Sequence, residues 1–236
     1  PCGVGISESI NVAIEKAVQA DPVSVFGGII ALNRELDVTG VQILEKIFLE
    51  CIVAPAVSKE AQELLIRKKN LRVLVWPQMM NAPSLYQLRK ISGGFLIQNE
   101  DGFNSVNDWQ FLTERPNESV LMDMIFGERV CAYLKSNAIA IVGEGKTLGL
   151  GMGQVNRVDA VEQAIQRMNK FAGHIKDKVL VSDAFFPFPD SVEKAAEAGI
   201  KWILQPGGSL KDNEVFQRAK ELGIHMVISG RRHFRH

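Results

Sequence analysis

The chain has 236 residues, 46% of them hydrophobic, which is enough to build one large domain or two small ones with proper cores. Its 27 basic and 27 acidic residues give a formal net charge of zero, which disfavours a general nucleic-acid or membrane-surface role. No apolar run approaches the ~20 residues of a membrane-spanning helix. The three cysteines, which are far apart, fit reduced thiols better than a disulfide framework, so we expect a cytoplasmic protein.

The first hundred residues alternate between helix-like and strand-like segments. Apolar residues recur at helical spacing over residues 7–20, and Asp21-Pro22 ends that helix. The later helices are expected at residues 41–48 and 59–69, and the strands at residues 29–32, 51–53, 71–75, 86–91 and 95–97, with an irregular connection over residues 76–86. Strand-sized runs this apolar are typical of a parallel sheet that is buried on both faces.

The second half begins after a polar, aperiodic stretch, residues 98–117, which we interpret as a linker. A helix over residues 119–133, a strand over 138–142, a glycine-rich stretch over 143–153 and a helix over 158–168 follow it. Both halves therefore have the order helix, strand, helix, strand, although no residue-level repeat is convincing. We expect two units, residues 1–100 and 101–236.

The C-terminal segment is the most informative part of the chain. Three short apolar runs, residues 179–181, 202–204 and 226–228, alternate with two helix-like segments, as in an α/β sheet. The residues that follow these runs are Asp183 and Phe185–Phe188, then Pro206–Ser209, then Arg231, Arg232, His233, Arg235 and His236. Ligands of open α/β sheets bind beyond the carboxyl ends of strands, so the three clusters are predicted to meet in one pocket.

The chemistry of that pocket follows from its residue types. The pair Gly207 and Gly208 precedes a helix and can expose backbone N–H groups to an anion, and the arginine cluster adds charge-assisted donors. The sequence therefore favours a phosphorylated or otherwise anionic small molecule.

Some motifs have structural readings that compete with functional ones. Gly145-Lys146-Thr147 resembles part of a phosphate loop, but the glycine that the full pattern requires is Ala140, so a hairpin turn is favoured. The histidines, His174, His225, His233 and His236, lack the spacing of zinc ligands, so no metal is expected.

Other residues remain open to two interpretations. Asp190 and Glu193 have the spacing of a capping box, which alone would explain Asp190. Asn137 precedes a buried strand, where an amide side chain often has the purely structural role of forming hydrogen bonds with backbone groups. Phe185, Phe186 and Phe188 can line a pocket for a flat ligand or fill the core, and the Arg232 cluster can be a solvated tail.

Specific motifs stand in order along the whole chain. They are Pro1-Cys2-Gly3, Asp21-Pro22-x-Ser24-x-Phe26-Gly27-Gly28, Lys135-Ser136-Asn137-Ala138, Gly151-x-Gly153-Gln154-x-x-Arg157, Ser182-Asp183-Ala184-Phe185-Phe186-Pro187-Phe188, Gln205-Pro206-Gly207-Gly208-Ser209 and Arg232-His233-Phe234-Arg235-His236. Together they resemble the transformylase part of the bifunctional AICAR transformylase/IMP cyclohydrolase family of purine biosynthesis.

The resemblance implies a fold, a reaction and an assembly. The fold would be two cytidine-deaminase-like three-layer α/β/α units with mixed sheets and no zinc. The reaction would transfer a formyl group from the co-substrate 10-formyltetrahydrofolate to the 5-amino group of the nucleotide AICAR. The active site would form where the two subunits of a homodimer meet.

The resemblance also implies roles for individual residues. Asn137 would hold the reacting amine and carboxamide, with Lys135 as the second candidate catalytic residue. The residues expected to contact the nucleotide are Gly27, Glu50, Arg157, Phe185, which would pack on the imidazole, and Arg232, which would bind the phosphate. The residues expected to hold the folate are Phe26, Val158, Pro187, Phe188, Asp190 and Ser209.

One part of the family pattern is not in this sequence. The family has a Lys-His pair a few residues before Pro-Cys-Gly, and that pair supplies a base and a cation, whereas this chain starts at Pro1. We therefore expect a fragment or processed chain that is impaired in catalysis by itself. The alternative function is a non-catalytic nucleotide- or folate-binding fragment, or a partial subunit that works with a separate chain.

Overall fold

The structure is a computed structural model that describes residues 1–81 and 86–235. Residues 82–85 of the expected irregular connection, and His236 of the C-terminal cluster, lie outside the described residues. The chain divides into a C-terminal unit, Pro1–Ser7, Glu15–Asp21 and Phe103–His236, and an N-terminal unit, Glu8–Ile14 and Pro22–Gly102. These ranges differ from 1–100 and 101–236, because two N-terminal stretches belong with the C-terminal unit.

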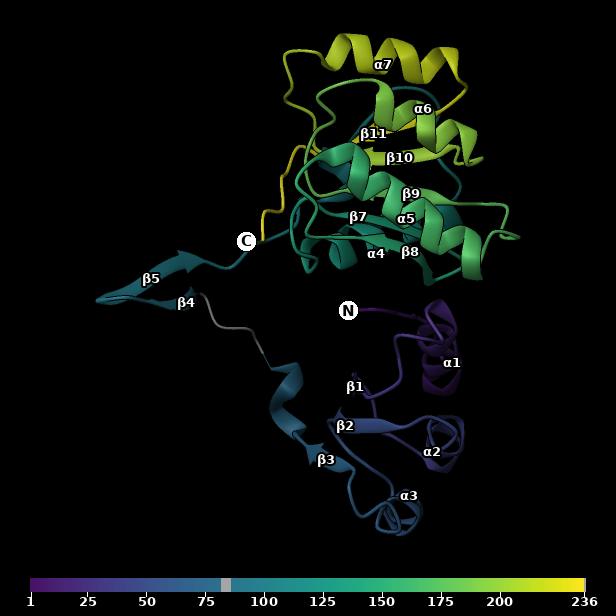
Figure 1. Ribbon diagram of the computed structural model, residues 1–236, viewed down its shortest axis with the longest axis vertical. Coiled ribbons are helices and arrows are strands. Elements are labelled where there is room, and N and C mark those ends of the chain that lie inside the picture. Colours follow the sequence, from purple (N-terminus) through teal and green to yellow (C-terminus); the bar gives the residue numbers. More distant parts are fainter. Residues whose placement is uncertain (82–85, 236) are drawn as a thin grey trace. The chain divides into compact units, whose positions relative to one another are not determined.

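The N-terminal unit (violet to blue in Figure 1) has a three-stranded parallel sheet in the order β1-β2-β3 and an antiparallel hairpin, β4-β5. Its strands are β1 (Gly28–Ala31), β2 (Leu49–Ala54), β3 (Arg72–Val75), β4 (Tyr86–Ile91) and β5 (Gly94–Asn99). Its helices are α2 (Val38–Leu44), α3 (Lys59–Leu65) and the short 3₁₀ helix η1 (Pro77–Met80), and α1 (Ile10–Ala20) is divided between the two units.

Side-chain caps fix where the helices of this unit begin. Asp37 accepts a hydrogen bond from the backbone N–H of Gly40 at 2.8 Å at the start of α2, and Ser58 caps α3 in the same way. The expected helix over residues 41–48 is too long, because α2 ends at Leu44 and Leu49 already pairs in β2. Apolar residues continue at helical spacing after the helix has ended, because the segment after Leu44 turns back toward the sheet.

The C-terminal unit is built on a mixed sheet of six strands in the order β6-β11-β10-β9-β7-β8. Its strands are β6 (Gln110–Phe111), β7 (Ile139–Gly143), β8 (Lys146–Gly151), β9 (Val179–Ser182), β10 (Trp202–Gln205) and β11 (His225–Ile228). Its helices are α4 (Glu118–Ala132), α5 (Arg157–Phe171), α6 (Asp190–Glu197), α7 (Asp212–Glu221) and the 3₁₀ helix η2 (Val106–Asp108). Strands β9, β10 and β11 are parallel, and the other pairings are antiparallel, so the predicted mixed α/β class is confirmed.

The predicted linker, residues 98–117, is wrong over part of its length. Strand β6 pairs antiparallel with β11, and Trp109 beside it is only 5% exposed and packs in the core. A two-residue strand is too short to show a period of two in the sequence, which is why the polar composition dominated the prediction.

Helices cover both faces of the six-stranded sheet. Alternate residues of β7 face opposite ways: Ile139 and Ile141 pack with α5, α6 and α7, whereas Ala140 and Val142 pack with α4. Figure 1 shows α5 in front of the sheet and the fainter α4 behind it. All five residues of β7 are buried, which explains the unbroken apolar run of the sequence.

The turn between β7 and β8 confirms the predicted hairpin at Gly145-Lys146-Thr147. Glu144 and Gly145 both have positive φ, 53° and 69°, as a two-residue type I′ turn requires. The backbone N–H groups of both residues donate to the carboxylate of Asp123 at 3.0 and 2.9 Å. Burial raises the pKa of Asp123, against the lowering effect of these two hydrogen bonds.

Two glycines let α5 lie unusually close to β8. A Cβ at Gly149 would stand 2.0 Å from the carbonyl oxygen of Ala164, and one at Gly151 would stand 1.9 Å from that of Ala160. Because the obstacle in both cases is helix backbone, no rotamer change can relieve it.

Gly149→Ala is expected to lower the free energy of unfolding by about 1–3 kcal/mol, the usual cost of overpacking a core. Gly173→Ala is the control, since a Cβ there would make only ordinary contacts, the nearest at 3.5 Å. Urea denaturation of both variants measures the difference. Equal midpoints would show that the helix can move away from the strand at little cost.

Candidate functional site

The segments that follow β9, β10 and β11 contact one another, as predicted, while a shared pocket between them stays a prediction. Parallel strands β9, β10 and β11 place their carboxyl ends at one edge of the sheet. The backbone N–H of His233 donates to the carbonyl of Asp183 at 2.9 Å, and the Nη2 of Arg232 donates to the carbonyl of Gly208 at 3.3 Å. One chain segment after β11 thus contacts the segments after β9 and β10.

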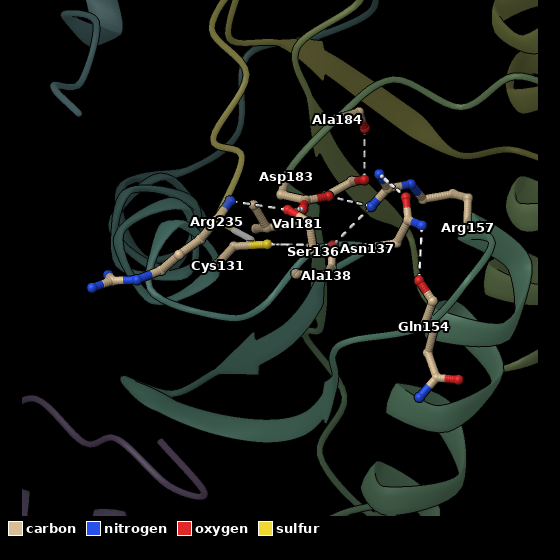
Figure 2. A network of polar contacts seen from close by, with 11 residues as sticks. Cys131, Ser136, Asn137, Ala138, Gln154, Arg157, Val181, Asp183, Ala184 and Arg235 are labelled. Atoms are coloured by element: carbon tan, nitrogen blue, oxygen red, sulfur yellow. Dashed lines mark hydrogen bonds and ion pairs between the residues drawn. The ribbon is translucent and has the colours of Figure 1, made fainter. Parts of the chain in front are cut away.

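Asn137, Arg157 and Asp183 form a network beside this edge (Figure 2). The Nη1 of Arg157 pairs with Asp183 and donates to the carbonyl of Ala138 at 3.0 Å. The Nη2 of Arg157 donates to Oδ1 of Asn137 at 2.8 Å. Arg157 is 6% exposed and Asp183 is 0% exposed, so this is a buried ion pair that fixes its neighbours.

The side chain of Asn137 uses both ends of its amide in hydrogen bonds within the protein. Its Nδ2 donates to the carbonyl of Gln154 at 2.9 Å, which satisfies a backbone group, while its Oδ1 accepts from Arg157. Asn137 is nevertheless only half-buried, so the amide can also reach a ligand. Lys135 is exposed, and its carbonyl accepts from the N–H of Gly153 at 2.6 Å, which ties the two loops together.

The phenylalanine cluster divides between the core and the surface. Phe186 is fully buried in the core on the α5 side. Phe185 is half-buried, with the Arg232 guanidinium 4.7 Å from its ring centroid, and exposed Phe188 has the Lys211 ammonium at 4.6 Å. Arg232 is exposed, but its guanidinium lies against an aromatic ring.

The capping box predicted from Asp190 and Glu193 is wrong. Helix α6 begins at Asp190 itself, after Pro189, and no side chain caps it. Oδ1 of Asp190 accepts from the adjacent Ser191 N–H at 2.6 Å, and Glu193 pairs with Arg218 at 2.7 Å. The helix starts one residue earlier than the capping spacing needs, so Asp190 is its first residue and not its N-cap, and its side chain is half-buried at the start of the helix.

The expectation that Gly207 and Gly208 offer free N–H groups to an anion is also wrong. The N–H of Gly207 donates to the side chain of Gln205 at 2.9 Å, and that of Gly208 donates to Asp212 at 2.7 Å. Protein acceptors already occupy both donors, so the cationic donor of this region is Arg232. Ser209 follows, and its hydroxyl accepts from the Lys211 N–H at 3.1 Å. The remaining predicted folate residues, Val158 and Pro187, are both half-buried.

The predicted site residues of the N-terminal unit form a separate group around Phe48. The ring of Phe26 lies 5.2 Å from that of Phe48, and the N–H of Gly27 donates to the Phe48 carbonyl at 2.8 Å. Gly27 has a φ of 70°, which favours glycine. Glu50 forms an exposed ion pair with Arg72 at 3.1 Å.

The sequence pointed to Asp183 but not to its partner. It also did not reveal that Ser136 contacts Asp183 or that Gln154 contacts Asn137. Ser136 donates to Oδ2 of Asp183 at 2.6 Å and accepts from the N–H of Arg235 at 3.2 Å. An acidic residue directly after a buried strand was the available signal, but only the fold brings Arg157 to it. Across residues 1–81 and 86–235, no group of three or more His, Cys, Asp or Glu side chains could hold a metal ion, and no helix is suited to crossing a membrane.

Comparison with known proteins identifies the family. The model of the AICARFT/IMPCHase bienzyme family matches residues 1–167. The chain belongs to this family. The resemblance seen in the sequence motifs is thereby confirmed.

Curated AICARFT/IMPCHase relatives extend the match over the remaining residues. The bifunctional purine biosynthesis protein PurH of Nostoc punctiforme is 46% identical over 238 residues, which cover 100% of this chain and 46% of that protein. PurH of Synechococcus elongatus is 47% identical with the same coverage. The chain thus spans about half the length of these purine-biosynthesis relatives.

Solved structures similar to this member of the AICARFT/IMPCHase family include deaminases. The dCMP deaminase of cyanophage S-TIM5 has a TM-score of 0.34 and 17% identity, covering 48% of this chain and 98% of that one. RibD of Acinetobacter baumannii has a TM-score of 0.32 and 14% identity, covering 47% and 34%. TM-scores this low do not establish a shared fold or function.

Proposed function

We propose that this chain carries the formyl-transfer site of its family, which moves the formyl group of 10-formyltetrahydrofolate to the 5-amino group of AICAR. Family membership over residues 1–167 supports this assignment. The observation that carries it is the cluster of Asn137, Arg157, Phe185 and Arg232 at one edge of the sheet. These residues supply an amide, two cations and an aromatic face, which are the groups that a phosphorylated imidazole carboxamide needs.

The chemistry explains why an oriented amide matters. The amine of AICAR is a poor nucleophile, because its lone pair is delocalised into the imidazole that bears the carboxamide. Asn137 would accept a hydrogen bond from the amine through its oxygen and donate to the carboxamide through its nitrogen. As the amine attacks the formyl carbon, negative charge develops on the formyl oxygen, and the ammonium of Lys135 would stabilise it. The attacking amine loses a proton, and the tetrahedral intermediate expels the folate nitrogen, which takes up a proton to give tetrahydrofolate.

The nucleotide would lie across the strand ends. Arg232 would bind its phosphate and Phe185 would pack on its imidazole. Arg157, held by Asp183, would contact it beside Asn137. Gly27 and Glu50 are further nucleotide contacts that the family motifs imply.

The folate would use residues around the start of α6 together with the exposed aromatic rings. The proposed contacts are Phe26, Val158, Pro187, Phe188, Asp190 and Ser209. We further propose two deaminase-like units without zinc, a homodimer with the active site between its subunits, and a cytoplasmic protein.

The function is tested with a full-length protein that contains this chain. The assay follows the AICAR-dependent conversion of 10-formyltetrahydrofolate to tetrahydrofolate, together with the appearance of formyl-AICAR. Turnover that needs both substrates supports the proposal. Binding of AICAR and folate without turnover would instead identify a non-catalytic binding protein.

Arg232→Ala is expected to weaken AICAR binding by about 1.5–3 kcal/mol, the range for a hydrogen bond to a charged group. The nucleoside without its phosphate should lose little, since it lacks the anion that Arg232 binds. Calorimetry with both ligands measures the difference. Equal losses for nucleotide and nucleoside would show that Arg232 acts mainly through its packing on Phe185.

A further inference from the structure

The carboxylate of Asp183 is the most deeply buried charge near the proposed site. It is 0% exposed, and each of its oxygens has a partner: Oδ1 pairs with Arg157 and Oδ2 accepts from the Ser136 hydroxyl at 2.6 Å. Its backbone is fixed as well, because its N–H donates to Ala138 at 3.2 Å and its carbonyl accepts from His233. A buried charge held on all sides is a rigid reference point for the groups that it contacts.

The guanidinium of Arg157 transmits this rigidity. Its Nη1 is shared between Asp183 and the Ala138 carbonyl, which fixes the plane of the group. Its Nη2 therefore points in one direction, toward Oδ1 of Asn137 at 2.8 Å. These three contacts use three of the five N–H donors of the guanidinium.

The amide of Asn137 is consequently held in one of its two orientations. Its oxygen accepts from Arg157 and its nitrogen donates to the Gln154 carbonyl at 2.9 Å, so a flip of the amide would break both hydrogen bonds. One lone pair on the oxygen and one hydrogen on the nitrogen remain. These are the two groups that an amine and a carboxamide on neighbouring ring atoms require.

Asp183 also connects this amide to the C-terminal segment that carries Arg232. The hydroxyl of Ser136 donates to Asp183 and accepts from the N–H of Arg235, and the N–H of Ser136 donates to the Arg235 carbonyl at 2.9 Å. Together with the hydrogen bond from the His233 N–H to the Asp183 carbonyl, these bonds hold the C-terminal segment on both sides of Phe234. Figure 2 shows Ser136 between Arg235 and Asp183.

We propose that Asp183 is a positioning residue: together with Ser136 it fixes the amide orientation of Asn137 through Arg157 and holds the Arg232 segment in register with it. This inference rests on the proposed formyl transfer. It adds that a residue that touches neither substrate sets the geometry between the reacting amine and the phosphate. Such geometry decides whether bound reactants are in line for attack.

The main test is Asp183→Asn, which keeps the shape of the side chain and removes its charge. In a full-length protein that contains this chain, kcat is expected to fall about 10–100-fold, the effect of a small misplacement of reacting groups. The KM for the folate should stay unchanged, because no folate contact is altered. Ser182→Ala is the matched control, since the Ser182 hydroxyl is buried next to Asp183 but donates only to the Ala184 carbonyl at 2.6 Å.

A second variant and a second measurement cover the case in which Asp183→Asn does not fold. Ser136→Ala keeps the ion pair between Asp183 and Arg157 and removes the two hydrogen bonds of the Ser136 hydroxyl, to Asp183 and from the Arg235 N–H, so a smaller fall in kcat is expected. The side-chain amide signals of Asn137, measured by ¹⁵N NMR on this chain and assigned by their loss in Asn137→Leu, should shift in both variants but not in Ser182→Ala.

The outcomes separate this inference from the proposed function. Unchanged Asn137 signals and unchanged kcat in the variants overturn the positioning role, as does a variant that is only less stable while its folded fraction keeps full kcat. No formyl transfer by the unaltered full-length protein overturns the proposed function instead. The NMR shifts would still decide whether Asp183 orients the amide.

Discussion

Asn137→Leu is expected to lower kcat for formyl transfer by about 10²–10³-fold, the usual loss when one positioned polar group at a reacting centre is removed. Leucine has nearly the same size but can neither accept from the amine nor donate to the carboxamide. The KM for the folate should change much less. Steady-state kinetics in a full-length protein that contains this chain measures both quantities.

A structural contribution of Asn137 has to be separated from the catalytic one. The variant also removes hydrogen bonds to Arg157 and to Gln154, so some loss of stability is expected. Asn156→Ala is the control: Asn156 caps helix α5 by accepting from the Asp159 N–H at 2.8 Å, and its loss costs about 0.5–2 kcal/mol of stability. It should leave kcat unchanged. If Asn137→Leu melts earlier yet keeps normal kcat when folded, Asn137 only satisfies backbone groups.

Phe186→Ala is expected to cost about 3–5 kcal/mol in the free energy of unfolding, the range for truncating a buried phenylalanine. Phe186 is 0% exposed and lies in the core that the sheet shares with α5, α6 and α7. Truncation leaves a cavity that the surrounding β-sheet and helices cannot close. Urea denaturation followed by circular dichroism measures the loss.

Phe188→Ala, two residues along the chain, is the matched comparison. Phe188 is 51% exposed, so its truncation should change stability by no more than about 0.5 kcal/mol, as is usual for surface positions. Under the proposed function it should weaken folate binding, whereas the folded fraction of Phe186→Ala should bind folate normally. Similar stability losses in both variants would contradict the division of the phenylalanine cluster between core and surface.

The sequence was sufficient for those parts of the fold that depend on local patterns. The short apolar runs predicted β7, β9, β10 and β11, and the rule for ligands of α/β sheets predicted that the segments after β9, β10 and β11 come together. Strand β6 was missed because two residues carry no periodicity and its pairing with β11 joins segments far apart in the chain. Local patterns cannot report such a pairing.

The candidate site was predictable as a set of residues but not as a geometry. Motif resemblance named Asn137 and Arg157 separately, whereas the hydrogen bond between them exists because the start of β7 and the start of α5 lie together. The glycine pair Gly207 and Gly208 illustrates the opposite case. Its pattern favoured an anion site, but the side chains of Gln205 and Asp212, which the pattern does not include, take both donors.

The position of β11 inside the sheet has a consequence for how the chain folds. This strand is the last in sequence, yet it lies between β10 and β6, and β6 has no other partner strand in the described sheet. During synthesis β10 emerges from the ribosome before β11, so the edge of β10 that pairs with β11 is unpaired until β11 has emerged. Such edges readily pair with other chains. Closing the sheet also brings together segments distant in sequence, which makes folding slow. The exposed edge of β10 is therefore the point at which we expect nascent chains to depend on chaperones.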